Sequence, residues 1–167
     1  MNTRITRSIF SLILLVALLA PAWALDQSQI SSVLSEIDEA AQERDVQKIA
    51  SFLSDSVVIS MEVPTPQGIA RIEIGKEEYL DILAQVWNAT GRGYTYSRKS
   101  IDIAITNDGN RAQATSIVFE GAQVNGQVFS SESLEVADFA EENGEVVVVR
   151  IHASTYIKGS PVPKASI

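Results

Sequence analysis

The chain has 167 residues, 46% of them hydrophobic, and a formal net charge of −8 from 21 acidic and 13 basic residues. Excess negative charge repels phosphate backbones and anionic lipid surfaces, which argues against nucleic-acid binding. There is no cysteine and one histidine, so disulfides are excluded and only scattered carboxylates remain as metal ligands. We therefore predict no metal site and no cofactor.

The first 24 residues have the three parts of an export signal. Arg4 and Arg7 give a positive start, residues 9–20 form an apolar run, and Ala22 and Ala24 match the small-residue pattern read by signal peptidase. The apolar run, about twelve residues long, is shorter than the roughly 20 that span a bilayer. We expect cleavage after Ala24, giving a bacterial periplasmic or secreted protein with no stable membrane anchor; an uncleaved anchor is the alternative.

The remainder of the chain forms one predicted domain, residues 25–157. Residues 25–167 carry 11 basic and 21 acidic residues, a formal charge of −10, because the first 24 residues contain two basic and no acidic ones. A segment of about 140 residues buries a sufficient core by itself. Gly159, Pro161 and Pro163 predict a loosely held tail at residues 158–167.

The first half of the domain predicts three helices and two strands. Apolar residues at helical spacing indicate a helix over about residues 28–43, and Asp45 is a good N-cap for a second, shorter helix. Residues 57–74 contain two β-rich runs separated by a turn rich in proline and glycine. A third helix begins after Gly75 and ends at Gly91.

Four long strands separated by turn residues follow, at about residues 94–105, 111–123, 127–142 and 145–156. Asn125-Gly126 and Asn143-Gly144 favour two-residue type I′ turns, and turns of known length fix the register of the strands that they join. With these turns, Leu134 lies opposite Ile117.

The same register sorts the strand residues into two faces, and it places Glu135 opposite His152. One face carries large apolar side chains, and we expect the helices to cover it; it includes Thr115, Ile117, Phe119, Leu134, Val136, Val147, Val149, Ile151 and Ala153. The other face is rich in small residues, which suit close packing against a second sheet. We expect a homodimer through this face, including Ala114, Ser116, Ala137, Arg150 and His152; a modestly polar exposed face is the alternative.

Several segments resemble the nuclear transport factor 2-like superfamily, and together they span most of the domain. They are Arg44–Leu53 followed by Val57–Met61, the helix opening Gly75-x-x-x-Tyr79, Asp108-Gly109, and the ending Arg150-x-His152-x-Ser154. That ending is similar to the His-x-Ser of polyketide-cyclase-like members. The resemblance implies an α+β fold in which a curved, mostly antiparallel sheet packs on three helices as a cone-like barrel. It also implies dimerisation through the sheet.

Members of this superfamily often hold a small organic ligand between the helices and the sheet. We expect the walls of such a pocket to include Met61, Tyr79, Trp87 and Phe119, with Glu132 as its polar group. Pockets are mostly apolar with few polar groups, so a small hydrophobic or aromatic molecule is the expected ligand. A carboxylate there does chemistry only if water is kept away from it.

The sequence leaves three functions of different classes open, because the fold alone does not imply function. The first is an exported small-molecule-binding domain of unknown ligand. The second is an isomerase- or cyclase-like enzyme that uses a pocket carboxylate, as the resemblance to ketosteroid-isomerase-like members suggests. The third is a purely structural dimeric accessory protein, which a core without a cavity favours. No serine lies in a nucleophile elbow, and no catalytic signature is legible.

Overall fold

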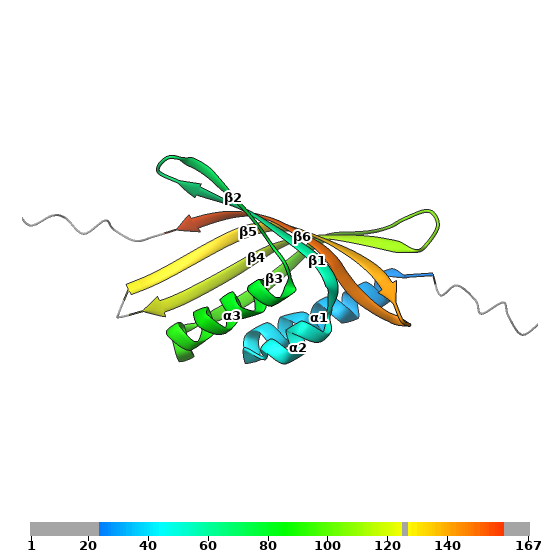
Figure 1. The fold of residues 1–167 in the computed structure, drawn as a ribbon, viewed down its shortest axis with the longest axis horizontal. Helices are drawn as coiled ribbons and strands as arrows, with labels where there is room; N and C mark the ends of the chain where they lie inside the picture. Colours follow the sequence, from blue (N-terminus) through cyan, green and yellow to red (C-terminus); the bar gives the residue numbers. More distant parts are fainter. Residues whose placement is uncertain (1–23, 125–126, 159–167) are drawn as a thin grey trace, which may run out of the picture.

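A computed structural model of the chain describes residues 24–124 and 127–158. The predicted export signal apart from Ala24, the predicted tail apart from Lys158, and the Asn125-Gly126 turn lie outside the described residues. The elements in chain order are α1 (Gln27–Glu43), α2 (Val46–Ser51), β1 (Leu53–Thr65), β2 (Gly68–Ile74), α3 (Lys76–Thr90), a 3₁₀ turn (Gly91–Gly93), β3 (Thr95–Ile105), β4 (Arg111–Val124), β5 (Gln127–Glu142) and β6 (Glu145–Lys158) (Figure 1).

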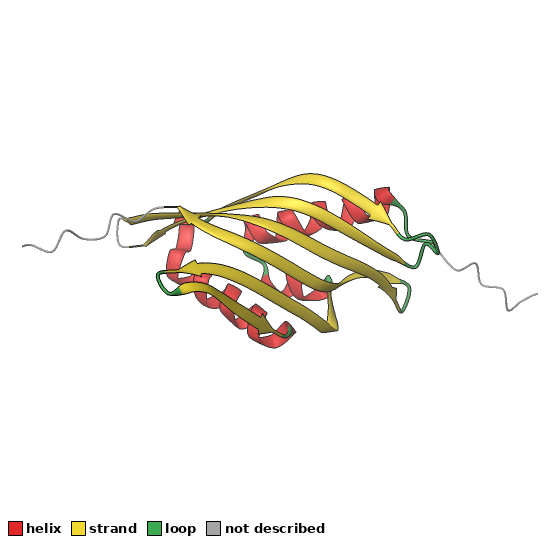
Figure 2. Cartoon of the chain, turned by 90° about the horizontal axis from the view of Figure 1, so that it is seen from above, coloured by secondary structure: helices red, strands yellow, loops and turns green. Residues whose placement is uncertain are grey.

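The six strands form one curved sheet in the order β2-β1-β6-β5-β4-β3, and the three helices cover one of its faces (Figures 1 and 2). Strand β1 runs parallel to β6, and every other neighbouring pair is antiparallel. The predicted α+β fold, a mostly antiparallel sheet packed on three helices, is confirmed. The edge strands β2 and β3 do not pair with each other, so the sheet is curved as expected but does not close into a barrel.

Local capping explains where the first two helices begin. Asp26 caps α1, since its carboxylate accepts from the Gln29 N–H at 2.9 Å and the Gln29 side chain accepts from the Asp26 N–H at 2.9 Å. Asp45 caps α2 in the predicted way by accepting from the Lys48 N–H at 2.9 Å. Within the described residues, no helix combines the length and apolar character needed to cross a membrane.

The predicted register is confirmed at both hairpins and fails further along β6. Asn143 and Gly144 both have positive φ, as a type I′ turn requires, and Leu134 pairs with Ile117. A bulge between Asp138 and Phe139 then shifts the pairing by one residue, a shift that turn chemistry cannot reveal. His152 consequently lies opposite Val136, and Glu135 lies opposite Ala153.

The prediction of which sheet face the helices cover was wrong for β4 and β5. Ala114, Ser116 and Ala137, expected in a dimer interface, are buried beneath the helices. Phe119 and Leu134, expected to be covered, are 40% and 49% exposed on the opposite face. Small side chains allow a helix backbone to approach the sheet closely, so a strip of small residues fits a helix-covered face as well as a sheet–sheet interface.

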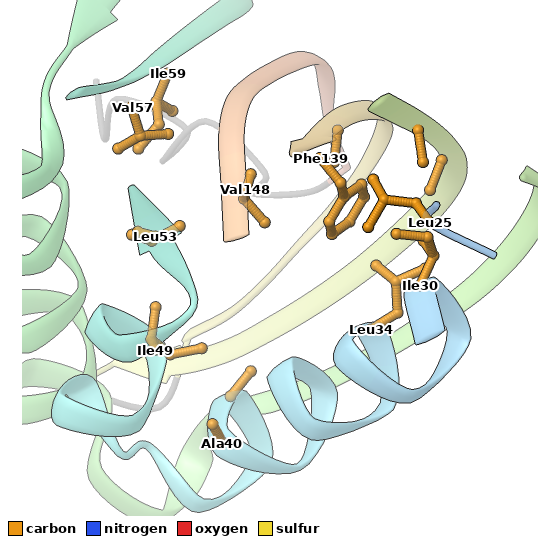
Figure 3. Packing of buried hydrophobic residues seen from close by; sticks show 14 of the residues in the cluster. Leu25, Ile30, Leu34, Ala40, Ile49, Leu53, Val57, Ile59, Phe139 and Val148 are labelled. Carbon is orange, nitrogen blue, oxygen red and sulfur yellow. The ribbon is translucent and has the colours of Figure 1, made fainter. Parts of the chain in front are cut away.

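The core extends to the start of the described chain. Phe139, fully buried, belongs to the same cluster as Ile30, Leu34 and Leu25 (Figure 3). Leu25 is 4% exposed, and its backbone N–H donates to the carbonyl of Gly109 at 2.8 Å. The β3–β4 turn therefore holds the residues that precede α1. A side chain at Gly109 would meet Ala24, since an added Cβ would lie 2.7 Å from the Ala24 Cβ.

Candidate functional site

A cavity of about 240 Å³ lies between α3 and the inner face of the sheet. Apolar residues of α1, α2 and above all α3, whose apolar stripe recurs at helical spacing, form one wall, and inward-facing residues of β1 and β3–β6 form the other. Predicted pocket residues Met61, Tyr79 and Trp87 line it. Ile82 and Val86 of α3 also line it while remaining substantially exposed, so the cavity opens beside this helix.

The two other predicted pocket residues lie elsewhere. Phe119 and Glu132 pair with each other across β4 and β5, and neither lines the cavity. Their neighbours Glu120 and Ser133, one residue further along each strand, do line it. Successive strand residues alternate between faces, so the inverted face assignment displaced each prediction by one residue.

The residues predicted for a dimer face are divided between the two sides of the sheet. Ala137 lines the cavity, and Ala114 and Ser116 are buried beneath the helices. Arg150 and His152 are exposed, as expected of a surface. The bulge in β6 accounts for this division, because it reverses the alternation of β6 relative to β5.

Arg98 of β3 occupies the centre of a buried charged cluster on the cavity wall. Its Nε donates to Asp38 of α1 at 2.8 Å, and its Nη1 donates to Glu135 of β5 at 2.6 Å. Its Nη2 donates to the Tyr96 hydroxyl at 2.8 Å, which itself donates to Asp38 at 3.0 Å. The Arg98 side chain is 5% exposed, against 25% for Asp38 and 17% for Glu135. The cluster therefore ties α1 to two strands.

A second polar pair, Tyr94 and Glu120, lies on the same wall. The Tyr94 hydroxyl donates to one carboxylate oxygen of Glu120 at 2.7 Å, and Ser131 donates to the other at 3.5 Å. The Tyr94 ring also packs edge-on against Trp87, with 5.9 Å between the ring centroids. This pair gives the cavity a carboxylate beside two aromatic rings.

The phenols of the cavity stay neutral over the physiological pH range. Burial raises the pKa values of Tyr79, Tyr94 and Tyr96 well above the ordinary value of 10, and nearby carboxylates, chiefly Glu120 and Glu135, raise them further. Burial alone would lower the pKa of Arg98, but its acidic partners more than offset this effect. The hydroxyls therefore remain hydrogen-bond donors, and Arg98 remains charged.

One polar group on the cavity wall has an unused hydrogen bond. The Trp87 side chain is 5% exposed, and its indole N–H has no hydrogen-bond acceptor among the described residues. It lies near the Tyr94 hydroxyl without meeting hydrogen-bond geometry. Buried donors are nearly always satisfied, so this group is suited to an acceptor supplied by water or a ligand.

The described residues contain no group of three or more histidine or acidic side chains placed to hold one metal ion. The polar groups that line the cavity are carboxylates, phenols, an indole, one guanidinium and the hydroxyls of Ser133 and Thr155, set in an apolar wall.

Solved structures with the same architecture place the fold among known ones. A conserved protein from Planctomyces limnophilus aligns with a TM-score of 0.68 at 21% identity, covering 80% of this chain and 98% of that one. A nuclear transport factor 2-like protein of unknown function from Pseudomonas putida aligns with a TM-score of 0.59 at 15% identity, covering 76% and 84%. This chain has the nuclear transport factor 2-like fold.

A scytalone dehydratase-like protein from Novosphingobium aromaticivorans shares this fold with a TM-score of 0.61 at 14% identity, covering 83% of this chain and 94% of that one. No protein-family profile and no curated protein matches the sequence at a significant level. Identities this low establish the nuclear transport factor 2-like fold alone, so function must be argued from the cavity itself.

The sequence analysis missed the charged residues that line the cavity, Arg98, Glu120 and Glu135. Tyr94, Tyr96 and Arg98 recur at every second position, a spacing that puts all three on one face of the extended chain that enters β3. This pattern was the available signal for an inward-facing arginine. The partner acid Asp38 lies 60 positions away on α1, and its contact with Arg98 depends on how that helix crosses the sheet.

Proposed function

We propose that this protein is an exported small-molecule-binding domain whose ligand occupies the cavity between α3 and the sheet. The observation that carries the proposal is a mostly apolar cavity with a few converging polar groups, which is the usual composition of a ligand site. Its volume of about 240 Å³ exceeds the roughly 150 Å³ cavity that holds benzene in another protein, so a single ring with a short substituent fits. The sequence of residues 1–24 supports export.

Filling the cavity should remove its ligand without unfolding the domain. Ala153 lines the cavity and faces Met61 across the β1–β6 pair, so Ala153→Leu projects added carbon atoms into the space. Native mass spectrometry of the protein from its own host should show a bound small molecule in the wild type. Occupancy in the variant should fall at least about tenfold because of steric overlap.

Ser154→Leu is the matched control, because this exposed residue follows Ala153 on the same strand and does not line the cavity. It should retain the ligand at wild-type occupancy. Equal occupancy in Ala153→Leu and wild type would contradict the proposed site. A wild type that neither carries a ligand nor binds single-ring aromatics would favour the structural hypothesis.

An enzyme is the second candidate, and the position of Glu120 favours it. This carboxylate lines the cavity and accepts from Tyr94, so it is suited to act as a general base towards a bound substrate. It takes the place that the sequence analysis gave to Glu132. Turnover of a cavity ligand that disappears in Glu120→Gln, with binding retained, would support this candidate.

We also propose that the protein forms a homodimer through the outer face of the sheet. The large apolar residues Phe119, Leu134 and Tyr156 are exposed on β4, β5 and β6, and their register places them on the outer face of the sheet, with Glu132 between Phe119 and Tyr156. Exposed large apolar side chains that lie close together on an open sheet are typical of an interaction surface. A second copy is the partner we infer, because a two-fold axis through the sheet sets the same apolar residues against themselves.

Leu134→Arg should make the protein monomeric while leaving its fold unchanged. The residue is half exposed in the single chain, so arginine is accommodated there, whereas in a dimer it places an unpaired charge in an apolar interface. We expect association to weaken roughly a hundredfold. Sedimentation at micromolar concentration measures the change. A monomeric wild type would contradict the interface.

A further inference from the structure

Negatively charged side chains outnumber positively charged ones around the cavity. Arg98, Glu120 and Glu135 line it, and Asp38 binds Arg98 from α1, so this set carries one positive and three negative formal charges. Arg98 is already surrounded by two carboxylates and a phenol. Its charge is therefore matched within the protein and is not available to an anionic ligand.

Glu120 is in a different situation. Its contacts are with two hydroxyls, those of Tyr94 and Ser131, and no salt bridge to it occurs among residues 24–124 and 127–158. Hydroxyl donors stabilise a carboxylate without neutralising it. The cavity therefore presents a negative charge whose counter-ion the described chain does not supply.

The rings beside Glu120 have the same electrostatic preference. Tyr94 bonds directly to Glu120 and packs edge-on against Trp87, and Tyr79 lines the cavity from α3. The faces of aromatic rings carry negative partial charge and attract ammonium groups, most strongly in the case of tryptophan. Burial is the main cause of the raised pKa values of Tyr79 and Tyr94, and the further rise that the charge of Glu120 causes at both phenols agrees with a negative potential in this part of the cavity.

We propose that the cavity selects a cationic ligand: a small aromatic or apolar molecule with one protonated or quaternary amine, its nitrogen against Glu120 and the rings of Trp87 and Tyr94. The inference rests on the proposed small-molecule binding and specifies its ligand class. The apolar wall formed by α3 and β1 takes the hydrocarbon part of the molecule. An amine cation supplies the positive charge that the protein leaves out.

Three probes of nearly equal shape test this proposal: phenyltrimethylammonium, tert-butylbenzene and benzenesulfonate. They carry a positive, a zero and a negative charge on a benzene ring. Trp87 reports binding by fluorescence in the full chain carrying Trp23→Phe, because these two residues are the only tryptophans. The cation should bind about tenfold more tightly than its neutral isostere, and the anion should bind more weakly than both.

Two charge-removing variants locate the effect. Glu120→Gln keeps the shape of the side chain and should abolish the preference for the cation while leaving tert-butylbenzene affinity within about twofold of wild type. Glu132→Gln removes the same charge from the opposite face of the sheet and should leave both affinities unchanged.

The outcomes separate the two proposals. Equal affinity for cation and neutral isostere, unaffected by Glu120→Gln, would overturn the cation proposal and leave small-molecule binding standing. Tightest binding by benzenesulfonate would overturn it in favour of Arg98 as the recognising group. Absence of binding by all three probes, in a protein that also carries no ligand from its host, would overturn both. The expected order, lost in Glu120→Gln and kept in Glu132→Gln, supports both.

Discussion

Ala114→Arg should unfold the domain. Ala114 is 2% exposed in β4, paired with Ile103 and Ala137 on the face beneath the helices. Arginine there overpacks the core, at about 1–3 kcal/mol, and buries an unpaired charge, which adds several kcal/mol. The sum approaches the whole stability of a typical domain, about 5–15 kcal/mol. Circular dichroism and thermal unfolding measure the loss.

Thr115→Arg is the control, because Thr115 is the next residue of the same strand and its side chain lies on the opposite face. This variant should fold with nearly wild-type stability. The two variants together test which face the helices cover. A folded Ala114→Arg protein that has merely become monomeric would restore the original expectation of a dimer interface at Ala114.

Arg98→Met should be the second most damaging change. It leaves the carboxylates of Asp38 and Glu135 without their shared cation in a largely buried site. Breaking a buried ion pair by removing one partner costs about 3–5 kcal/mol, and the partial exposure of both acids places the expected loss near the lower end. Urea unfolding measures it. Cavity binding should weaken as well, because the Arg98 cluster forms part of the wall.

Two further variants test whether the loss of stability in Arg98→Met is electrostatic. Arg71→Met removes an arginine whose bond to Glu62 is on the surface, with the Arg71 side chain 80% exposed, and should cost less than about 1 kcal/mol. Replacing Asp38 and Glu135 with their amides in the Arg98→Met background should recover most of the lost stability. No recovery in the triple variant would assign the loss to packing of the arginine stem.

Much of the fold could be predicted because its signals are local. Asp45 caps a helix through bonds to residues a few positions away, and Asn143-Gly144 sets the register of a hairpin by its own backbone preference. No local sequence pattern of this kind marks the β-bulge of β6 opposite Asp138. It depends on how β5 and β6 bend over the core, and its effect is to change the partner of His152.

The cavity was predicted in position and only partly in composition. Tyr79 and Trp87 were identified because helical spacing places them on one stripe of α3, a property of a single segment. The polar residues depend instead on which sheet face is inside. Either face of β4 and β5 could pack against the helices, the one with small residues such as Ala114 or the one with large residues such as Phe119. The choice between the two faces decided whether Glu120 or Glu132 was assigned to the site.

The burial of Leu25 bears on the order of events during maturation. Signal peptidase needs an accessible, extended substrate, and although Ala24 is exposed, Leu25 on the other side of the bond to be cut is already part of the core. With cleavage after Ala24, as proposed, the protease must act before the β3–β4 turn docks. Cleavage then turns the Leu25 amide into an amino group that can donate to the same Gly109 carbonyl. The new N-terminus would then fasten the start of α1 to the β3–β4 turn in the mature protein.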